Sequence, residues 1–369
     1  MVEKVRVLEL FAGIGACSKA LERLGVEHEI VDAVEIDKYA IKAFNAIHST
    51  NFEPQDITKW DKDIECDLIM HGSPCQDFSI AGKQAGGDKN SGTRSSIMYE
   101  TLRIVEKLKP KYVIWENVKN VLSKKHRHNF DAYQKAMEDL GYVNYFQVLN
   151  AKDYGVPQNR ERVFTVSIRD DHKSTIIERL NECFKFPARK PLTKKLKDIL
   201  EGVVEEKYYL TEDRLAAIKV WENRQKENGR GFRFEVKDDN SIGRSVTTSG
   251  DRPCSTNYIA IKNNTRKGYI EAYDGDGVDC SFPASNTRRG RVQHGLSQTL
   301  PASGPCIGVA DNFRVRKLTP KECYRLMGFD DIDYEKASKV ISNTQLYKTA
   351  GNSIVVNVLE GILGELLWK

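Results

Sequence analysis

The sequence lacks any pair of cysteines at the C-x-x-C spacing that zinc sites and redox sites use. Its eight cysteines stand far apart, at positions 17, 66, 75, 183, 254, 280, 306 and 323. Several of them fall inside apolar runs, where a disulfide would be hard to form. We therefore expect reduced cysteines and no bound metal.

Long apolar runs and a large charge excess are missing as well. No apolar stretch approaches the roughly 20 residues that a membrane helix needs, and residues 1–6 lead into a strand pattern rather than a signal peptide. The 57 basic and 52 acidic residues leave a net charge of +5, which permits a polyanionic partner without proving one. These absences predict a cytoplasmic protein with no membrane partner.

Over residues 5–168, short apolar runs alternate with helical patterns, which is typical of βαβ units and a parallel sheet. The first strand is expected at Val5–Leu10, and the first helix runs from Ala16 to Leu24, where Gly25 ends it. Further strands are expected at residues 29–34, 68–71, 112–115, 145–149 and 163–168, and helices at residues 38–47, 96–108 and 129–140. This part is predicted to be a doubly wound α/β domain with a mostly parallel sheet.

The composition changes near residues 186–187, after which lysines lead into sequence rich in Gly, Ser, Thr and Asn. Between residues 230 and 311 the pattern predicts short strands and loops, and residues 343–369 regain helical character. With 369 residues and 40% hydrophobic composition, the chain can form one large and one smaller core. We predict a first domain of residues 1–187 plus 340–369, and a second, smaller, irregular β-rich domain with a hinge at residues 188–339.

A candidate nucleophile, Cys75, lies on a loop that follows the apolar run at residues 66–70. Pro74 fixes its own φ and pushes Ser73 towards an extended conformation, so the backbone that enters Cys75 is stiff. Glu116 follows a second apolar run, which would place its carboxylate at the same edge of a sheet. A thiol and a carboxylic acid facing one pocket can attack an electron-poor ring carbon and protonate the ring elsewhere. Taken singly, Cys75 could be a buried small hydrophobic residue and Glu116 a surface ion-pair partner.

The turn after the first strand carries Gly13 and Gly15, which would let a ligand approach the backbone where a helix begins. Ser18 stands where the dinucleotide fingerprint has its third glycine, which counts against a pyrophosphate ligand. Glu35 ends the next strand at the offset where an acidic residue binds ribose hydroxyls, and Asp56 could accept from an adenine amino group. Together these residues predict an adenosine-bearing ligand, although either carboxylate alone would suit a solvated loop.

Six short motifs follow one another along the chain. They are Phe11-Ala12-Gly13-Ile14-Gly15, Ser73-Pro74-Cys75-Gln76, Glu116-Asn117-Val118, QNRER at residues 158–162, RKLTPKEC at residues 316–323 and Gly351-Asn352-Ser353. In this order the sequence resembles a bacterial or phage member of the DNA (cytosine-5)-methyltransferases over residues 5–168 and 315–369, leaving residues 187–312 as a variable stretch. The resemblance implies the Rossmann-like fold of S-adenosylmethionine-dependent methyltransferases, with a target-recognition domain at residues 188–339.

The resemblance implies a reaction in which Cys75 adds to C6 of a cytosine while Glu116 holds and protonates N3. Arg162 would steady Glu116 and the base, and Arg160 or Arg162 could supply positive charge that favours the Cys75 thiolate. C5 would then take a methyl group from S-adenosylmethionine. Because a base stacked in a duplex cannot reach Cys75, the cytosine would have to be flipped out.

The resemblance also assigns ligand-binding residues. S-adenosylmethionine would be held by Phe11, Gly13, Gly15, Glu35, Ile36, Asp56, Ile57, Pro74, Asn352 and Ser353. Double-stranded DNA would be contacted by Ser79, Gln84, Arg252, Arg288, Arg289, Arg291 and Thr299. Arginines suit phosphates and guanines, although a basic cluster alone is more often a solvated surface. We expect a monomer in the cytoplasm of a bacterial cell or phage-infected host, acting in restriction–modification or as an orphan methylase.

Two positions depart from the usual pattern of the family. Ser73 replaces the first proline of the more common Pro-Pro-Cys, and Glu9 stands where aspartate is frequent. A contact of Glu9 with the methionine part of the cofactor is therefore left open. His71, four residues before Cys75, is interpreted as a core residue or a residue behind the site rather than as part of a Cys/His pair.

Three alternatives remain. A tRNA (cytosine-5) methyltransferase of the same family would share Cys75 and Glu116, but the long arginine-containing insert favours DNA. The second alternative is a DNA-binding repressor with an inactive methyltransferase core, and the intact Cys75, Glu116 and Arg162 argue against it. A nicotinamide-dependent oxidoreductase would fit the glycine turn and Glu35, but neither Ser18 nor the Pro-Cys loop.

Overall fold

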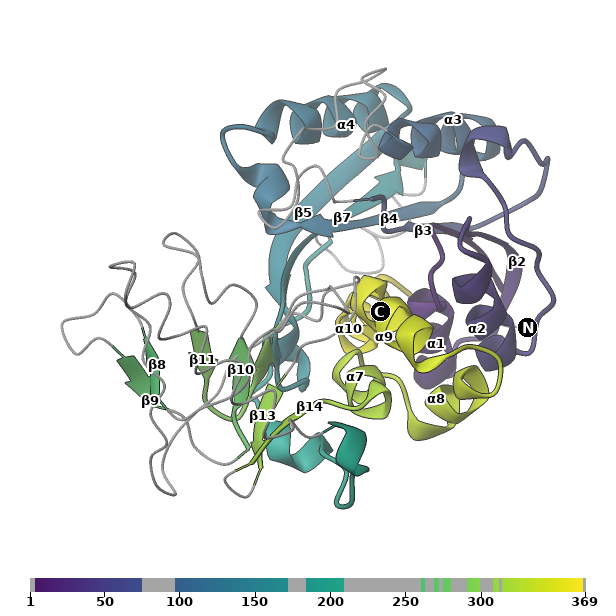
Figure 1. Ribbon diagram of the computed structural model, residues 1–369. Coiled ribbons are helices and arrows are strands. Elements are labelled where there is room, and N and C mark those ends of the chain that lie inside the picture. Colours follow the sequence, from purple (N-terminus) through teal and green to yellow (C-terminus); the bar gives the residue numbers. More distant parts are fainter. Residues whose placement is uncertain are drawn as a thin grey trace, which may run out of the picture. The chain divides into compact units, whose positions relative to one another are not determined.

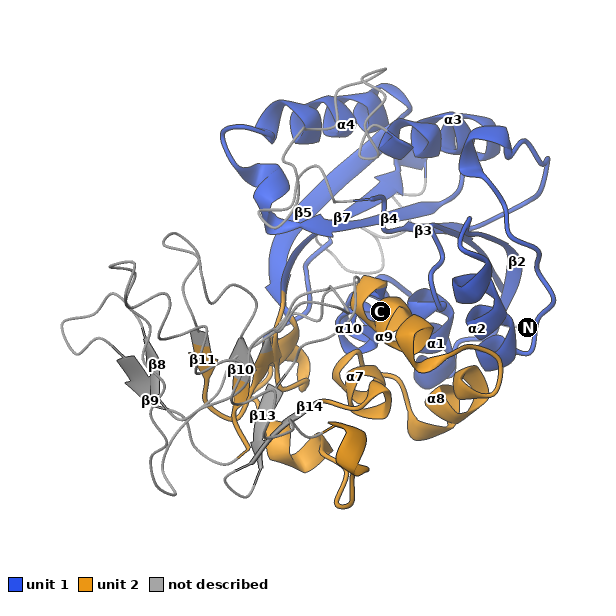
Figure 2. Ribbon diagram, viewed as in Figure 1, with its two compact units in different colours: residues 1–150, 161–189, 353–369 blue, residues 151–160, 190–352 orange. Residues whose placement is uncertain are grey.

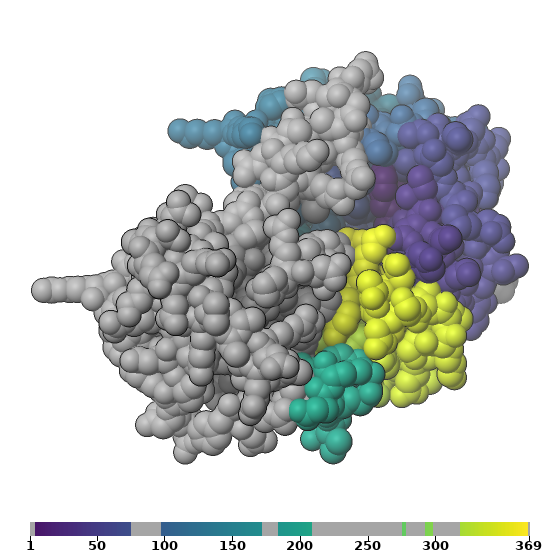
Figure 3. Space-filling view, in the orientation of Figure 1, coloured from purple at the N-terminus to yellow at the C-terminus, as the bar shows by residue number. Residues whose placement is uncertain are grey.

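The structure is a computed structural model, and it describes residues 4–74, 97–171, 184–208, 260–262, 269–271, 275–279, 291–298, 308–311 and 314–367. The coloured atoms of the space-filling view belong to this part of the chain (Figure 3). Seven residues of the predicted site lie outside it, namely Cys75, Ser79, Gln84, Arg252, Arg288, Arg289 and Thr299, and so does the side chain of Arg291.

The chain divides into two compact units (Figure 2). The first comprises residues 1–150, 161–189 and 353–369, and the second comprises residues 151–160 and 190–352. The predicted functional boundaries after residues 187 and 339 remain predictions.

The first unit contains a six-stranded sheet in the order β2-β1-β3-β4-β7-β5. Its strands are β1 (Val5–Leu10), β2 (His28–Val34), β3 (Leu68–His71), β4 (Tyr112–Val118), β5 (Tyr142–Asn150) and β7 (Glu161–Arg169). Its helices are α1 (Ala16–Leu24), α2 (Lys38–His48), α3 (Met98–Leu108), α4 (Arg127–Asp139) and α10 (Val356–Leu367), with the 3-10 turns η1 (Ile57–Lys59) and η3 (Lys119–Leu122). Helices α3 and α4 cover one face of the sheet, and α1, α2 and α10 cover the other (Figure 1). The strands and helices predicted for residues 5–168 are present, with ends displaced by at most three residues.

Strand direction follows the prediction over part of the sheet. Strands β2, β1, β3 and β4 run parallel, as the alternation of strands and helices predicts. Strand β7 is antiparallel to both β4 and β5, so the sheet as a whole is mixed. The cause is the short connection, because only residues 151–160 separate β5 from β7 and a parallel crossover needs roughly a dozen residues or more.

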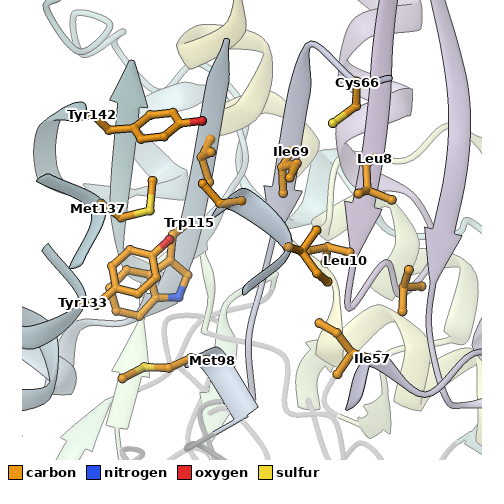
Figure 4. Close-up of a cluster of buried hydrophobic side chains, with 14 of the residues drawn as sticks. Leu8, Leu10, Ile57, Cys66, Ile69, Met98, Trp115, Tyr133, Met137 and Tyr142 are labelled. Carbon is orange, nitrogen blue, oxygen red and sulfur yellow. The ribbon is translucent and has the colours of Figure 1, made fainter. Parts of the chain in front are cut away.

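The core under α3 and α4 is organised around Trp115 of β4 (Figure 4). The ring of Trp115 lies 4.3 Å from that of Tyr133, centroid to centroid, and stacks on His71 at 6.0 Å. Nε2 of His71 shares a hydrogen bond of 2.8 Å with the hydroxyl of Tyr133. Burial lowers the pKa of His71 to about 3, so this imidazole is neutral. His71 is therefore a core residue, which confirms its interpretation.

Helix α10 packs against α1 and buries Leu359, Ile362 and Leu363. Within the described chain, residues 343–367 are long and apolar enough to cross a membrane by length and composition alone, so the expectation that no stretch approaches this length was wrong. The segment is nevertheless divided into α9 (Asn343–Asn352) and α10, and 56% of its apolar 18-residue window is buried. Its apolar character is accounted for by packing in the core.

The second unit contains short strands and helices. They are β6 (Gln158–Asn159), β8 (Ala260–Lys262), β9 (Tyr269–Glu271), β10 (Gly277–Asp279), β11 (Arg291–Gln293), β12 (Ser297–Gln298), β13 (Gly308–Asp311), β14 (Arg314–Lys317), α7 (Pro320–Leu326), α8 (Asp331–Ser338), α9, η4 (Ala151–Tyr154), η5 (Leu196–Ile199) and η6 (Glu206–Tyr208). Four strands form a sheet in the order β11-β10-β13-β14. Helix α7 begins with a capping box, in which Thr319 and Glu322 each accept the other's backbone N–H and Pro320 holds the first helical position.

Candidate active site

Strands β1, β2 and β3 end in register at one edge of the sheet, and the parallel strand β4 continues beyond that row to Val118. Leu10 of β1 is paired with Val34 of β2 and His71 of β3, and His71 is paired with Trp115 of β4. The residues that follow this row are Phe11, Glu35, Gly72 and Glu116. Ligands of open α/β sheets bind at this carboxyl edge. The expectation that Glu116 shares an edge with the chain that leads to Cys75 is confirmed.

The turn between β1 and α1 has three residues with positive φ, which are Phe11 (53°), Gly13 (57°) and Gly15 (79°). For a bulky residue such as Phe11 this conformation is strained, and strain of this kind is concentrated at functional sites. A Cβ atom at Gly13 would meet no atom of the described residues within 4 Å, whereas one at Gly15 would collide with the His48 imidazole. Gly13 therefore borders open space among the described residues, and Gly15 allows the start of α1 to lie against His48 and Phe44 of α2.

The carboxylate of Glu35 is held at the same edge. Its Oε2 accepts the backbone N–H of Gly13 at 3.0 Å, and its Oε1 accepts that of Asp37 at 2.8 Å. Burial raises the pKa of Glu35, and these two hydrogen bonds oppose the rise. Beside it, the side chain of Ile36 is 71% exposed.

Asp56 lies on a segment that is hydrogen-bonded to Glu35, because the backbone N–H of Gln55 donates to the Glu35 carbonyl at 2.8 Å. Oδ1 of Asp56 accepts from the backbone and the hydroxyl of Thr58, and these bonds lower the pKa of Asp56. The side chain of Ile57 is buried in the core. Two carboxylates, the exposed Ile36 and the open space at Gly13 suit an adenosine, whose hydroxyl and amino groups need acceptors.

Glu116 forms an ion pair with Arg162, whose Nε lies 3.0 Å from Glu116 Oε1. The two side chains are 11% and 15% exposed. A Cβ atom at Gly72 would lie 3.6 Å from Glu116 Oε2 and 3.3 Å from Cδ1 of Ile354. The carboxylate therefore lies against the chain that enters Ser73 and Pro74.

Ser73 makes contacts that the sequence analysis did not foresee. Its hydroxyl accepts the Nε1–H of Trp115 at 3.0 Å, and the amide of Asn117 lies 3.4 Å from both its hydroxyl and its carbonyl oxygen. Trp115 and Asn117 are two residues apart on β4, so their side chains point to the same face. That alternation was the only signal in the sequence that could have indicated a shared partner.

Glu9 is buried beneath the first turn of α1. Its Oε1 accepts the backbone N–H of Ser18 at 3.0 Å and also the Ser18 hydroxyl. Burial raises the pKa of Glu9 to about 7, against the effect of these hydrogen bonds. Gly15, at the N-cap, has no side chain with which to cap α1, so Glu9 satisfies a helix N–H in its place.

The remaining predicted residues of the described chain have separate environments. Arg160 is buried, with Nη2 3.2 Å from the carbonyl oxygen of Gly351. Asn352 ends α9 and is exposed, whereas Ser353 is buried and its hydroxyl donates to the carbonyl of Ile354. Among the described cysteines, 17, 66 and 323 are buried free thiols. Within the described ranges no group of His, Cys, Asp and Glu has the arrangement of a metal site.

A sequence model described as "C-5 cytosine-specific DNA methylase" matches residues 5–368. The chain belongs to this family. Among its relatives, the orphan methyltransferase M.SPRI of Bacillus phage SPR is 33% identical, with 99% of this chain and 98% of that protein covered. The type II methyltransferase M.HhaI of Haemophilus parahaemolyticus is also 33% identical, with 97% and 93% covered.

Solved structures show the same fold. A DNMT2 mutant of Spodoptera frugiperda superimposes with a TM-score of 0.60 at 19% identity, covering 98% of this chain and 99% of the other. The Dnmt2 methyltransferase of S. pombe gives 0.58 at 18% identity, with 99% of both chains covered. As a member of the C-5 cytosine-specific DNA methylase family, the protein is a DNA (cytosine-5)-methyltransferase with a Rossmann-like fold, as the resemblance implied.

Proposed function

We propose that the protein methylates C5 of a flipped-out cytosine in double-stranded DNA through a covalent adduct between Cys75 and C6. The observation that carries this proposal is the Glu116–Arg162 ion pair beside Gly72. A carboxyl group at that place adjoins the chain that leads to Cys75, so an acid and a nucleophile can act on one ring.

Each residue has one task in this reaction. The Cys75 thiolate gives an electron pair to C6, and Glu116 delivers a proton to N3, which leaves C5 electron-rich. Arg162 holds the carboxyl group of Glu116 in orientation through the 3.0 Å contact. S-adenosylmethionine, when bound, supplies an electrophilic methyl group for C5. A base then removes the C5 proton, the thiolate leaves C6, and N3 returns its proton to Glu116, so that the ring is restored as 5-methylcytosine.

S-adenosylmethionine would be held by the carboxyl edge of the sheet. Glu35 would accept from the ribose hydroxyls and Asp56 from the adenine amino group, with Phe11 and Ile36 against the adenine. The backbone at Gly13, Gly15, Ile57 and Pro74 would border the ligand, and Asn352 and Ser353 would complete the site. Glu35→Ala should weaken binding of the cofactor by about 1–3 kcal/mol, measured by calorimetry.

Residues 188–312, within the second predicted domain, would select the target sequence. The relatives include orphan methyltransferases of phages and type II methyltransferases of bacteria, so the protein would act either as an orphan methylase or in restriction–modification. In either role it would work as a monomer in the cytoplasm of a bacterial cell or phage-infected host. Grafting residues 188–312 from a relative with another target should move the methylated site. An active chimera that still methylates the original motif would place specificity elsewhere.

The test is transfer of tritiated methyl from labelled S-adenosylmethionine to duplex DNA, single strands and tRNA. We expect duplex DNA to be labelled and to contain 5-methylcytosine, and labelling of tRNA alone would favour the tRNA enzyme. A duplex with 5-fluorocytosine should trap the protein as an adduct that survives denaturation. Cys75→Ser should abolish both results while cofactor binding is kept, and full activity of this variant would exclude the covalent mechanism.

A further inference from the structure

A buried carboxylate on β2, outside the predicted site, accepts hydrogen bonds from four donors of the described chain. Asp32 is 1% exposed and lies three residues before Glu35. Its Oδ1 accepts the backbone N–H of Ala33 at 3.0 Å and Nε2 of Gln55 at 2.8 Å. Its Oδ2 accepts Nε1 of Trp60 at 2.8 Å and Nζ of Lys62 at 2.8 Å.

Three of these donors bracket the segment proposed to bind adenine. Gln55 comes directly before Asp56, and Trp60 and Lys62 come shortly after Ile57. Asp32 therefore fixes residues 55–62 at both ends. Because the backbone N–H of Gln55 also donates to the carbonyl of Glu35, the segment and the end of β2 are held as one piece.

The charge of Asp32 makes these bonds strong. Burial alone would raise the pKa of Asp32, but hydrogen bonds from Lys62, Trp60 and Gln55 lower it, so the group is an anion at neutral pH. Charge-assisted hydrogen bonds are about twice as strong as neutral ones. Trp60 adds rigidity, because its ring is buried in the core.

Helix α3 holds the same segment from a second direction. Nη2 of Arg103 donates to the carbonyl of Ile57 at 3.0 Å, and Nζ of Lys107 lies 2.8 Å from Oδ1 of Asp61. These contacts leave Asp56 at the surface of a segment whose backbone is otherwise fixed. A carboxylate held in this way binds a ligand without first losing conformational entropy.

We propose that Asp32 is a positioning residue for the S-adenosylmethionine site. Asp32 holds Asp56 and Ile57 beside Glu35 and does not itself touch the ligand. This inference rests on the proposed function of the carboxyl edge. It predicts that Asp32 controls the affinity for the cofactor and leaves the methyl-transfer step at saturating cofactor unchanged.

The test compares Asp32→Asn with wild type by calorimetry with S-adenosylmethionine. An asparagine keeps one acceptor oxygen but presents an amide to the Trp60 and Lys62 donors. We expect Kd to rise about tenfold, which corresponds to roughly 1.4 kcal/mol, and KM for the cofactor to rise with it. The value of kcat should stay within about twofold of wild type, because the residues that act on cytosine are not altered.

Asp67→Asn is the matched control. Asp67 is also buried and ion-paired, with Arg6 and Lys111, but it lies at the amino end of β3, away from Glu35. Asp67→Asn should change Kd by less than about twofold, as expected for a distant and independent site. If Asp32→Asn alters Kd no more than Asp67→Asn does, or lowers kcat at unchanged Kd, the inference is wrong.

A second variant covers the case in which Asp32→Asn does not fold. Lys62 is 53% exposed, so Lys62→Met removes one donor without disturbing the core. Kd should then rise about threefold, since one charge-assisted bond of several is lost, and an unchanged Kd would overturn the inference. Wild-type protein that binds no S-adenosylmethionine would instead contradict the proposed function itself, and the inference with it.

Discussion

The indole Nε1–H of Trp115 donates a 3.0 Å hydrogen bond to the hydroxyl of Ser73. Trp115 is fully buried, and its ring contacts His71, Phe130 and Tyr133. Ser73 precedes Pro74 directly, at the position where the family more commonly has the first proline of Pro-Pro-Cys. A proline stiffens the chain through its ring, whereas here a hydrogen bond to the core holds the residue that leads to the Pro-Cys loop.

The first prediction concerns this hydrogen bond. Ser73→Ala should lower the free energy of unfolding by about 1–3 kcal/mol, because the buried indole N–H would lose its acceptor. Trp115→Phe should cost less in the Ser73→Ala background than in wild type, and the coupling should be about 0.5–3 kcal/mol. Urea denaturation of the two single variants and the double variant measures it, and strictly additive effects would show that the bond contributes nothing.

The second prediction concerns the acid. Glu116→Gln should lower kcat by about 10²- to 10⁴-fold, because the amide cannot deliver a proton to N3. Cofactor affinity should be kept, since Glu35 and Asp56 are unchanged. Glu161→Gln is the control, because Glu161 lies on β7 of the same sheet and forms an exposed ion pair with Lys119 of η3. Steady-state kinetics measures kcat, and calorimetry measures the affinity for the cofactor. If Glu116→Gln were as active as Glu161→Gln, Glu116 would not be the acid of the reaction.

Much of the carboxyl edge could be predicted because strand positions follow from apolar runs. The runs that end at Leu10, Val34, His71 and Trp115 each placed the next residue at one edge, and the register agrees. The direction of β7 could not be predicted in this way, since an apolar run has the same pattern in either direction. The connection after Asn150 determines it.

The contacts of Ser73 and Asp32 were missed for a different reason. Ser73 and Trp115 are 42 residues apart, and Asp32 and Trp60 are 28 apart, so neither pair belongs to one local motif. Each depends on which side chains meet after the sheet and its helices have packed. The role of Glu9 at α1 was missed in the same way, because it appears only once β1 and the helix are placed together.

The third prediction concerns pH. The folded pKa of Glu9, near 7, is above its ordinary value of 4.5, so the folded protein binds this proton more tightly than the unfolded chain. The resulting stability is complete below pH 4.5 and is lost as the pH rises through 7. Glu9→Gln keeps an acceptor for Ser18 but does not titrate, so it should gain on wild type by up to about 3 kcal/mol between pH 4.5 and 7.5.

Thermal or urea unfolding of both proteins across this range measures the difference. His48 titrates in the opposite sense, because burial lowers its pKa to about 4, but it is present in both proteins and its effect cancels. Parallel stability profiles for wild type and Glu9→Gln would mean that Glu9 keeps an ordinary pKa.

The last prediction separates the two glycines of the β1–α1 turn. Both have positive φ, so alanine at either position should cost about 1–2 kcal/mol of folding free energy. At Gly15 the added methyl group would also meet the imidazole of His48 and the ring of Phe44, which should cost roughly 1–3 kcal/mol more. At Gly13 the methyl group would enter space that no atom of the described chain occupies within 4 Å, where we propose that the cofactor binds.

Gly15→Ala should therefore be the less stable variant, and Gly13→Ala should be the one that loses affinity for S-adenosylmethionine, by about tenfold or more for a methyl group that overlaps a bound ligand. Each variant is the control for the other, because the two changes are chemically identical and lie two residues apart in one turn. Denaturation and calorimetry on the same preparations give both quantities. If Gly13→Ala binds the cofactor as tightly as wild type, the open space beside Gly13 is not part of the binding site, and the ligand must approach the edge of the sheet from Glu35 and Asp56 alone.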